Sequence, residues 1–126
     1  MSIKRKAYLM AIFLLVFQSQ ASGSTTKASW YSEASCKKEG TSGTHTASGE
    51  RFDEDAMTGA MWDIPFGTIV KVTNTSTSKY VYITINDRGP SRKLVKKGRI
   101  IDLSKGAFKK IADLKQGIIS VKVEIE

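Results

Sequence analysis

Two segments of the sequence run from β-branched residues into an acid, with an arginine close by. Residues 83–90 are Ile-Thr-Ile-Asn-Asp-Arg-Gly-Pro, and residues 98–104 are Gly-Arg-Ile-Ile-Asp-Leu-Ser. In the first segment alternating apolar residues stop at turn formers, the pattern of a strand that ends near Asp87. An acid fixed at a strand end by a rigid turn can expose a reactive carboxyl. Asp87 is therefore the first candidate for acid–base chemistry.

The first 21 residues have the pattern of a secretory signal peptide. A basic cluster at 4–6 precedes an apolar run at 7–17, and small and polar residues follow. A membrane anchor is the alternative, but about 11 apolar residues are too few to span a bilayer, which needs about 20. Ser19 and Ala21 suit a cleavage site after Ala21. We therefore expect a secreted or periplasmic protein with no stable membrane anchor after cleavage.

Removing residues 1–21 from the 126 leaves 105, enough for a single domain, predicted at 27–126 after a polar linker at 22–26. The signal takes three basic residues with it, so the formal net charge falls from +8 to +5. No basic run interleaved with aromatic residues is present, so we expect no nucleic-acid partner and favour an acidic cell-wall polymer. A solvated basic surface is the alternative.

A single cysteine, Cys36, and a single histidine, His45, limit the chemistry that the chain can perform. One cysteine permits no intrachain disulfide. Lys37 and Lys38 could supply the positive charge that a nucleophilic cysteine needs, but an unpaired or buried thiol is the favoured interpretation. One histidine and one cysteine do not make the usual zinc ligand set, so we expect neither a metal nor a cofactor.

The hydrophobic pattern predicts a mainly β protein. Period-two or β-rich stretches indicate strands at 27–31, 68–73, 80–85, 100–102 and 119–125. Ser104 is a candidate N-cap for a helix that ends at about residue 112. A surface loop at 32–49, a possible helical turn at 54–61 and a basic loop at 91–99 complete the prediction. Five or six short strands with one modest helix indicate a small closed β-barrel.

Five motifs, in order along the chain, give a family resemblance. They are Ala28-Ser29-Trp30-Tyr31, Thr46-Ala47-Ser48-Gly49-Glu50 with Phe52-Asp53, Asn86-Asp87-Arg88-Gly89-Pro90, Arg99-Ile100-Ile101-Asp102-Leu103-Ser104 and the strand 117–123. Together they cover nearly all of residues 28–125. The chain resembles the RlpA (rare lipoprotein A) family of lytic transglycosylases, which implies a six-stranded double-psi β-barrel with one or two short helices. We expect it to be a monomer.

The resemblance implies cleavage of peptidoglycan glycan strands between N-acetylmuramic acid and N-acetylglucosamine. Such enzymes use no water, because the primary hydroxyl of the sugar attacks and leaves an anhydro ring. One carboxyl can protonate the leaving oxygen and then accept the hydroxyl proton. By motif matching, Asp87 is the general acid/base, and Glu50 orients the substrate or stabilises developing positive charge. The alternative is that Asp87 caps a turn and that Glu50 is simply exposed.

Other residues near the two acids are assigned by the same matching. Asn86, Gly89 and Asp102 are expected to be structural residues near the site, with Asp102 binding backbone N–H groups at a helix start. The expected substrate-binding residues are Trp62, Arg88, Tyr31 and His45. An aromatic residue on a barrel strand is more often part of the core, and His45 fits an ordinary exposed loop residue equally well.

One position departs from the family pattern. Where the family usually has Thr-Ala-Ala-His-x-x-Leu-Pro, residues 58–65 are Thr-Gly-Ala-Met-Trp-Asp-Ile-Pro, so Met61 stands in place of the histidine. A thioether donates no hydrogen bond and carries no proton. The leading prediction is an exported lytic transglycosylase. The alternatives are a non-catalytic, expansin-like module that binds wall polysaccharide, and a secreted effector or inhibitor that shares the barrel.

Overall fold

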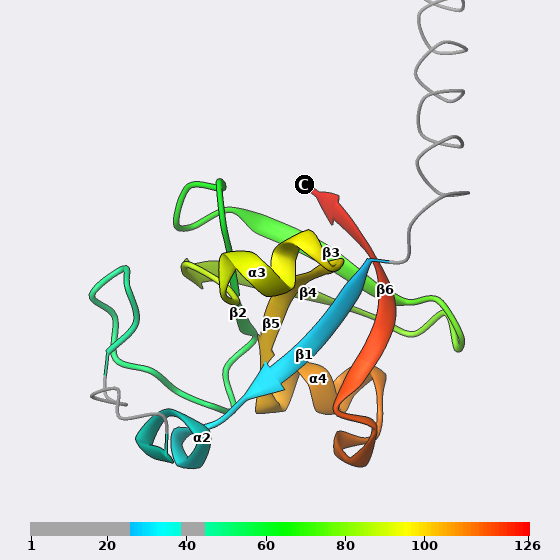
Figure 1. Cartoon of the computed structure of the whole chain (residues 1–126), viewed down its shortest axis with the longest axis horizontal. Coiled ribbons are helices and arrows are strands. Elements are labelled where there is room, and N and C mark those ends of the chain that lie inside the picture. The colour runs from blue at the N-terminus through cyan, green and yellow to red at the C-terminus, as the bar shows by residue number, and fades with distance from the viewer. Residues whose placement is uncertain (1–25, 39–44) are drawn as a thin grey trace, which may run out of the picture.

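The computed structural model describes residues 26–38 and 45–126. Figure 1 shows a barrel of short strands with small helices around it. The elements in chain order are β1 (Lys27–Tyr31), α2 (Glu33–Lys38), β2 (Thr58–Met61), β3 (Ile69–Asn74), β4 (Tyr80–Asp87), α3 (Arg92–Lys96), β5 (Arg99–Ser104), α4 (Lys105–Ile111), the 3₁₀ helix η1 (Leu114–Gln116) and β6 (Ile118–Ile125).

The six strands close on themselves in the order β1-β5-β2-β4-β3-β6. The pairs β1–β5 and β2–β4 are parallel, and the other four pairs are antiparallel. A closed barrel leaves no strand with an unpaired edge. The prediction of a mainly β, six-stranded barrel is confirmed.

Alternating side chains fill the inside of the barrel. On β4, Val81, Ile83 and Ile85 are buried, while Tyr80 and Tyr82 on the other face are about half exposed. This alternation is the one expected of a strand at 80–85, and that predicted strand is confirmed. The same alternation holds along β6 until the last residues, where Ile125 is 65% exposed.

Helix α4 packs its apolar side against the barrel, with Ala107, Phe108 and Ile111 buried. Ser104 is its N-cap, and the Ser104 hydroxyl accepts a hydrogen bond from the Ala107 N–H at 3.2 Å. The predicted cap and helix are confirmed.

Three predicted segments differ from the structure. The expected loop at 32–49 contains α2, although residues 39–44 lie outside the described part of the chain. The expected helical turn at 54–61 is a turn at 54–55 followed by β2. The expected loop at 91–99 contains α3, whose Leu94 and Val95 are half-buried. In each case short local sequence carries little signal, and contacts with distant strands decide the conformation.

A polar cluster ties β1 to β5. Ser29 and Asp102 are direct neighbours in this parallel pair. The Asp102 carboxylate accepts hydrogen bonds from the Ser29 hydroxyl and, at 3.1 Å, from the Arg99 guanidinium, which also donates to Ser29 Oγ at 2.6 Å. The expectation that Asp102 binds backbone N–H groups is therefore wrong: its partners are side chains, because it lies within β5 facing β1.

Replacing Asp102 should destabilise the barrel much more than replacing an exposed acid. The Asp102 side chain is only 17% exposed, and Asp102→Ala leaves Arg99 and Ser29 without their shared acceptor. We expect the free energy of unfolding to fall by about 2–3 kcal/mol. The measurement is chemical denaturation of the purified parent protein and of Asp102→Ala.

The matched control is Glu124→Gln, which breaks an ion pair between Glu124 and Lys122. The Glu124 side chain is 43% exposed and the Lys122 side chain 44%. A loss under about 0.5 kcal/mol is expected for this control. Equal, small losses for both variants would contradict a structural role for the Asp102 cluster.

Candidate active site

The segment before β2 forms a tight turn that carries Glu50. The Thr46 N–H donates to Glu50 O at 2.8 Å, and the Gly49 N–H donates to Thr46 O at 2.9 Å. Gly49 has φ +90°, a left-handed conformation that glycine adopts without strain. His45 and Arg51 pair across the base of the turn as an isolated bridge. These bonds fix residues 45–51 as one small unit.

This turn is bound to the end of β4. The Ser48 N–H donates to Asn86 O at 3.2 Å, and the Ala47 N–H donates to Asp87 Oδ1 at 3.1 Å. Two segments about 40 residues apart in sequence are thereby joined. The turn of Glu50 and the strand end of Asp87 lie side by side.

The carboxyl of Asp87 is half-buried and held on one side. Its Oδ1 accepts from the Ala47 N–H and, at 2.9 Å, from the Arg88 N–H. Within the described part of the chain, Oδ2 has no hydrogen-bond partner. One oxygen therefore orients the group, and the other is available to a ligand.

Glu50 is exposed and more loosely held. Its Oε1 accepts a hydrogen bond from the Ser48 hydroxyl at 3.3 Å, and that hydroxyl is 2.8 Å from Thr46 Oγ1. Both partners belong to the turn itself. The two acids thus differ in support: backbone donors hold Asp87, and one long side-chain bond holds Glu50.

The segment after β4 passes directly over the end of β2. Ala60 and Asp87 are neighbours in the parallel β2–β4 pair. Gly89 has φ +107°, and a Cβ at that position would lie 3.0 Å from Met61 Cα and 3.1 Å from Trp62 N. Only glycine fits this close approach. Met61 is half-buried, packs against the core and lies beside the candidate site.

Trp62 is fixed beside the same segment. Its Nε1–H donates to Pro90 O at 2.6 Å, and the Arg92 guanidinium lies 4.3 Å from the ring centroid. The ring is half-buried, with a cation stacked over it. Arg92 was not among the predicted site residues, since a basic residue in an expected loop carries no distinguishing signal.

The structure brings most of the predicted site residues to one region. Asn86 is buried and accepts from Ser48, Arg88 is exposed next to Asp87, and His45 is exposed at the base of the Glu50 turn. Tyr31 is half-buried and stacks on Phe52, which follows the same turn, with ring centroids 4.9 Å apart. Asp102 lies on β5, with β2 between it and β4, and its carboxylate is bonded to Ser29 and Arg99 instead of to residues of this group.

Two backbone donors of the site were missed from the sequence. The N–H groups of Ala47 and Ser48 join the turn to β4. Any residue other than proline carries such a donor, so residue type alone gives no signal for this role.

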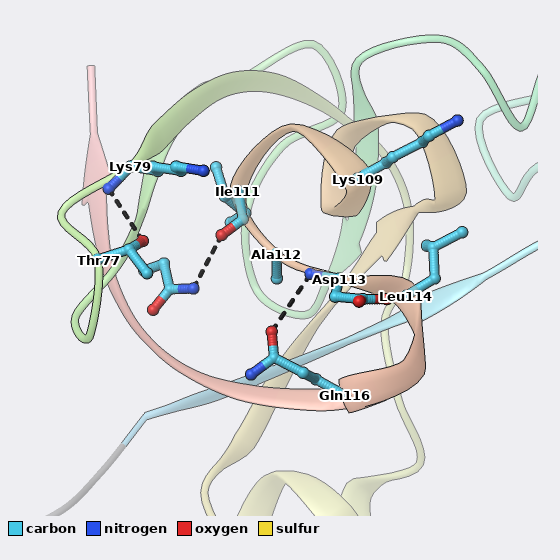
Figure 2. Close-up of a pocket in the computed structure, with 9 residues that line it drawn as sticks. Thr77, Lys79, Lys109, Ile111, Ala112, Asp113, Leu114 and Gln116 are labelled. Carbon is cyan, nitrogen blue, oxygen red and sulfur yellow. Dashed lines mark hydrogen bonds between the residues drawn. The ribbon is translucent and has the colours of Figure 1, made fainter.

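A cavity of about 450 Å³ lies elsewhere on the barrel, between the β3–β4 link and the α4–η1 junction (Figure 2). The Asn74 side-chain amide donates to Ile111 O at 2.8 Å across one side of this cavity. Lys79, in its lining, precedes the first residue of β4, whereas Asp87 is the last. This cavity is therefore separate from the candidate site.

Two features are absent from residues 26–38 and 45–126, a metal site and a membrane-spanning helix. No group of three or more His, Cys, Asp or Glu side chains is placed to hold a metal ion. None of the helices in these ranges has the length and apolar composition that crossing a membrane requires.

Curated relatives match this chain over most of its length. The probable endolytic peptidoglycan transglycosylase RlpA of Nostoc sp. is 45% identical over 87 residues, which are 69% of this chain and 22% of that protein. The endolytic peptidoglycan transglycosylase RlpA of Rickettsia felis is 43% identical over 100 residues, 79% of this chain and 41% of that protein. The chain thus spans less than half of each relative.

Solved structures with the same architecture are more distant in sequence. The Streptomyces papain inhibitor is 23% identical with a TM-score of 0.55, and the match covers 79% of this chain and 92% of the inhibitor. The expansin of Clavibacter michiganensis is 22% identical with a TM-score of 0.58, covering 80% of this chain and 48% of the expansin. These likenesses identify the fold as a double-psi β-barrel.

A family model described as lytic transglycolase matches residues 23–123, a range that includes the Glu50 turn, the end of β4 and all but the last residues of β6. The chain therefore belongs to the lytic transglycolase family, and RlpA proteins are among its relatives.

Proposed function

We propose that the protein is an exported lytic transglycosylase that cleaves peptidoglycan glycan strands between N-acetylmuramic acid and N-acetylglucosamine. One observation carries this proposal above all. The Ala47 N–H and the Ser48 N–H bind the turn of Glu50 to the strand end of Asp87 in a member of this family, which supports a site that contains both acids. The names of the relatives supply the substrate class.

In this mechanism Asp87 begins as the acid. Its free Oδ2 carries the proton to the glycosidic oxygen while the bond from that oxygen to the muramic sugar breaks. The N-acetylglucosamine side leaves with a new hydroxyl. Two backbone N–H groups on Oδ1 keep the carboxyl oriented during this step, so little reorganisation is needed.

Asp87 then acts as the base. The carboxylate accepts the proton of the muramic primary hydroxyl while that oxygen bonds to the anomeric carbon and closes the anhydro ring. The proton lent in the first step is thereby recovered, and no water is consumed. Exposed Glu50 orients the sugar or stabilises the positive charge that develops at the anomeric carbon.

The neighbouring side chains are proposed to hold the strand. Exposed Arg88 offers hydrogen bonds and positive charge beside the two acids, and exposed His45 offers a hydrogen bond. The rings of Trp62 and Tyr31 offer apolar contact to sugar faces. Asn86 and Gly89 shape the backbone under the site.

The proposal includes the localisation of the protein and its division into segments. Residues 1–21 are removed as a signal peptide, 22–26 form a linker, and 27–126 act in the cell envelope as a monomer. Mass measurement of the exported protein checks the cleavage site after Ala21, and a different first residue would move the boundary.

A second candidate function is non-catalytic binding of wall polysaccharide. Met61 supports it, because this half-buried side chain packs against the core beside Gly89, where the family resemblance implies a histidine. A thioether cannot supply the hydrogen bond or proton of an imidazole. In this alternative the barrel and its glycan contacts are retained and the proton transfer is lost.

Asp87→Asn should abolish cleavage with little cost to folding. The amide keeps the size of the carboxyl and an oxygen for the Ala47 N–H, but it cannot transfer the proton. We expect the release of anhydro-ended fragments from purified peptidoglycan to fall by about 10²–10⁴-fold, measured by mass spectrometry. Glu50→Gln should reduce the release of these fragments less, because the Glu50 carboxylate transfers no proton in the proposed mechanism.

The control for this pair is Glu124→Gln, an exposed acid on β6. It should release anhydro-ended fragments at the parent rate. Undiminished release from Asp87→Asn, or fragments with hydrolysed rather than anhydro ends, would contradict the proposed mechanism.

Met61→His distinguishes the two candidate functions. If the position serves the acids, an imidazole beside Gly89 should raise the rate of fragment release several-fold, while loss of apolar packing lowers the free energy of unfolding by about 1–2 kcal/mol. The matched control is Met57→His, since Met57 also packs partly buried against the core but precedes β2. It should lose similar stability and gain no activity. Glycan binding without cleavage in both the parent and Met61→His would favour the binding module.

A further inference from the structure

Exposed apolar side chains gather beside β4. In the described ranges six large apolar or aromatic side chains are more than two-fifths exposed: Phe66, Ile69, Tyr80, Tyr82, Ile118 and Ile125. Tyr80 and Tyr82 lie on β4, Ile69 pairs with Thr84 from β3, and Phe66 precedes Gly67, whose N–H donates to Ile85 O at 2.8 Å. We call Phe66, Ile69, Tyr82 and Tyr80 the β4 track. Single exposed apolar residues are ordinary, but two on β4 and two beside it indicate a contact surface.

The track leads from the β3–β4 link toward the candidate active site. The strand turns Tyr80 and Tyr82 outward while its odd-numbered residues fill the core. At about 3.3 Å per residue, Tyr82 and Tyr80 lie about 17 and 23 Å from Asp87 along the strand. Figure 1 shows the β3–β4 link on the opposite side of the barrel from the loop that carries Glu50. This spacing suits a polymer and exceeds the length of a single sugar.

The two tyrosines at the far end of the track are mutually fixed. Their rings meet edge to face, with centroids 5.8 Å apart and planes at 85°. The Lys71 ammonium lies 4.5 Å from the Tyr80 centroid and 6.0 Å from that of Tyr82. Rings already held in place lose little conformational entropy on binding. Such rings offer apolar contact to a sugar face, and their hydroxyls offer hydrogen bonds.

The charge around the tyrosines favours an anionic partner. Lys71 and Lys122 lie on the neighbouring strands β3 and β6, and exposed Lys79 precedes β4 at the edge of the cavity in Figure 2. Glu124, paired with Lys122 at 3.8 Å, is the neighbour of Lys71 on β6. Near the tyrosines three cations thus stand against one anion, and Glu126, whose N–H donates to Ile69 O at 3.0 Å, lies beside the other part of the track. A muramic sugar freed of its peptide stem carries a lactyl carboxylate, so peptide-free glycan strands have the complementary charge.

We propose that the β4 track binds sugars of the glycan strand several units away from the bond at Asp87, with Tyr80, Tyr82 and Lys71 as the farthest contact. The inference rests on the proposed function, since it takes the occupant of the track to be the polymer whose cleavage is assigned to Asp87. Long strands would then bind more tightly than short ones. A second copy of the chain is the competing occupant.

The test measures binding apart from cleavage. All variants are made in the full exported chain with Asp87→Asn, so that the glycan stays intact, and the probe is long glycan strands freed of peptide. Tyr80→Ala with Tyr82→Ala should weaken binding by about ten-fold or more, whereas Tyr80→Phe with Tyr82→Phe should stay within about two-fold. The matched control is Ile118→Ala, which removes a half-exposed side chain on β6 beside β1 and should not change the affinity.

Three results would overturn the track. The first is unchanged affinity in the double alanine variant, and the second is an equal loss of affinity in Ile118→Ala. The third is a double alanine variant that binds glycan as before but sediments as a monomer where the parent sediments as a dimer. The proposed function fails separately, when the unmodified chain releases no anhydro-ended fragments. If glycan binding depends on the two tyrosines and no anhydro-ended fragments are released, the track stands and the proposed enzyme activity fails. If such fragments are released and binding does not depend on the tyrosines, the enzyme activity stands and the track fails.

Discussion

The position of Asp87 depends on the pairing of β4 along both of its edges. This strand is antiparallel to β3 on one side and parallel to β2 on the other, so its backbone cannot shift without breaking two ladders. A slip of one residue would also turn Tyr82 into the core and Ile83 outward. Burial of apolar side chains therefore fixes the register. As the last residue of β4, Asp87 takes its place from that register.

The two acids receive different kinds of support, and the difference fits their proposed roles. Backbone N–H groups hold one oxygen of Asp87, and those donors remain whatever the side chains of Ala47 and Arg88 are. A proton must be delivered over a hydrogen-bond distance, which requires a fixed group. Glu50 is exposed, and among residues 26–38 and 45–126 its carboxylate bonds to the Ser48 hydroxyl of its own turn alone. Stabilising developing charge tolerates such freedom, since electrostatic attraction depends less on angle than proton transfer does.

Local patterns predicted the elements that have a clear sequence signal, and contacts with distant segments decided the rest. Alternation revealed β4, and a hydroxyl in the right place revealed the Ser104 cap. Strand β2 was not predicted from the sequence, because close packing against neighbouring strands selects its residue types. A Cβ on Gly59 would lie 2.5 Å from Ile83 Cδ1 and 3.1 Å from Asp102 O. Motif matching brought Asp87 and Glu50 forward, but the backbone bonds that join them have no sequence signature.

Met61 separates membership of the family from catalytic competence. The barrel needs only an apolar side chain there, because Met61 packs against the core and its backbone supports Gly89. The proposed chemistry needs more, if this position carries a histidine in active relatives as the resemblance implies. A thioether satisfies the packing and leaves the hydrogen-bonding role empty. The fold and the proposed glycan contacts of β4 can therefore persist whether or not a hydrogen-bonding group stands at this position, since packing and hydrogen bonding are different properties of one side chain.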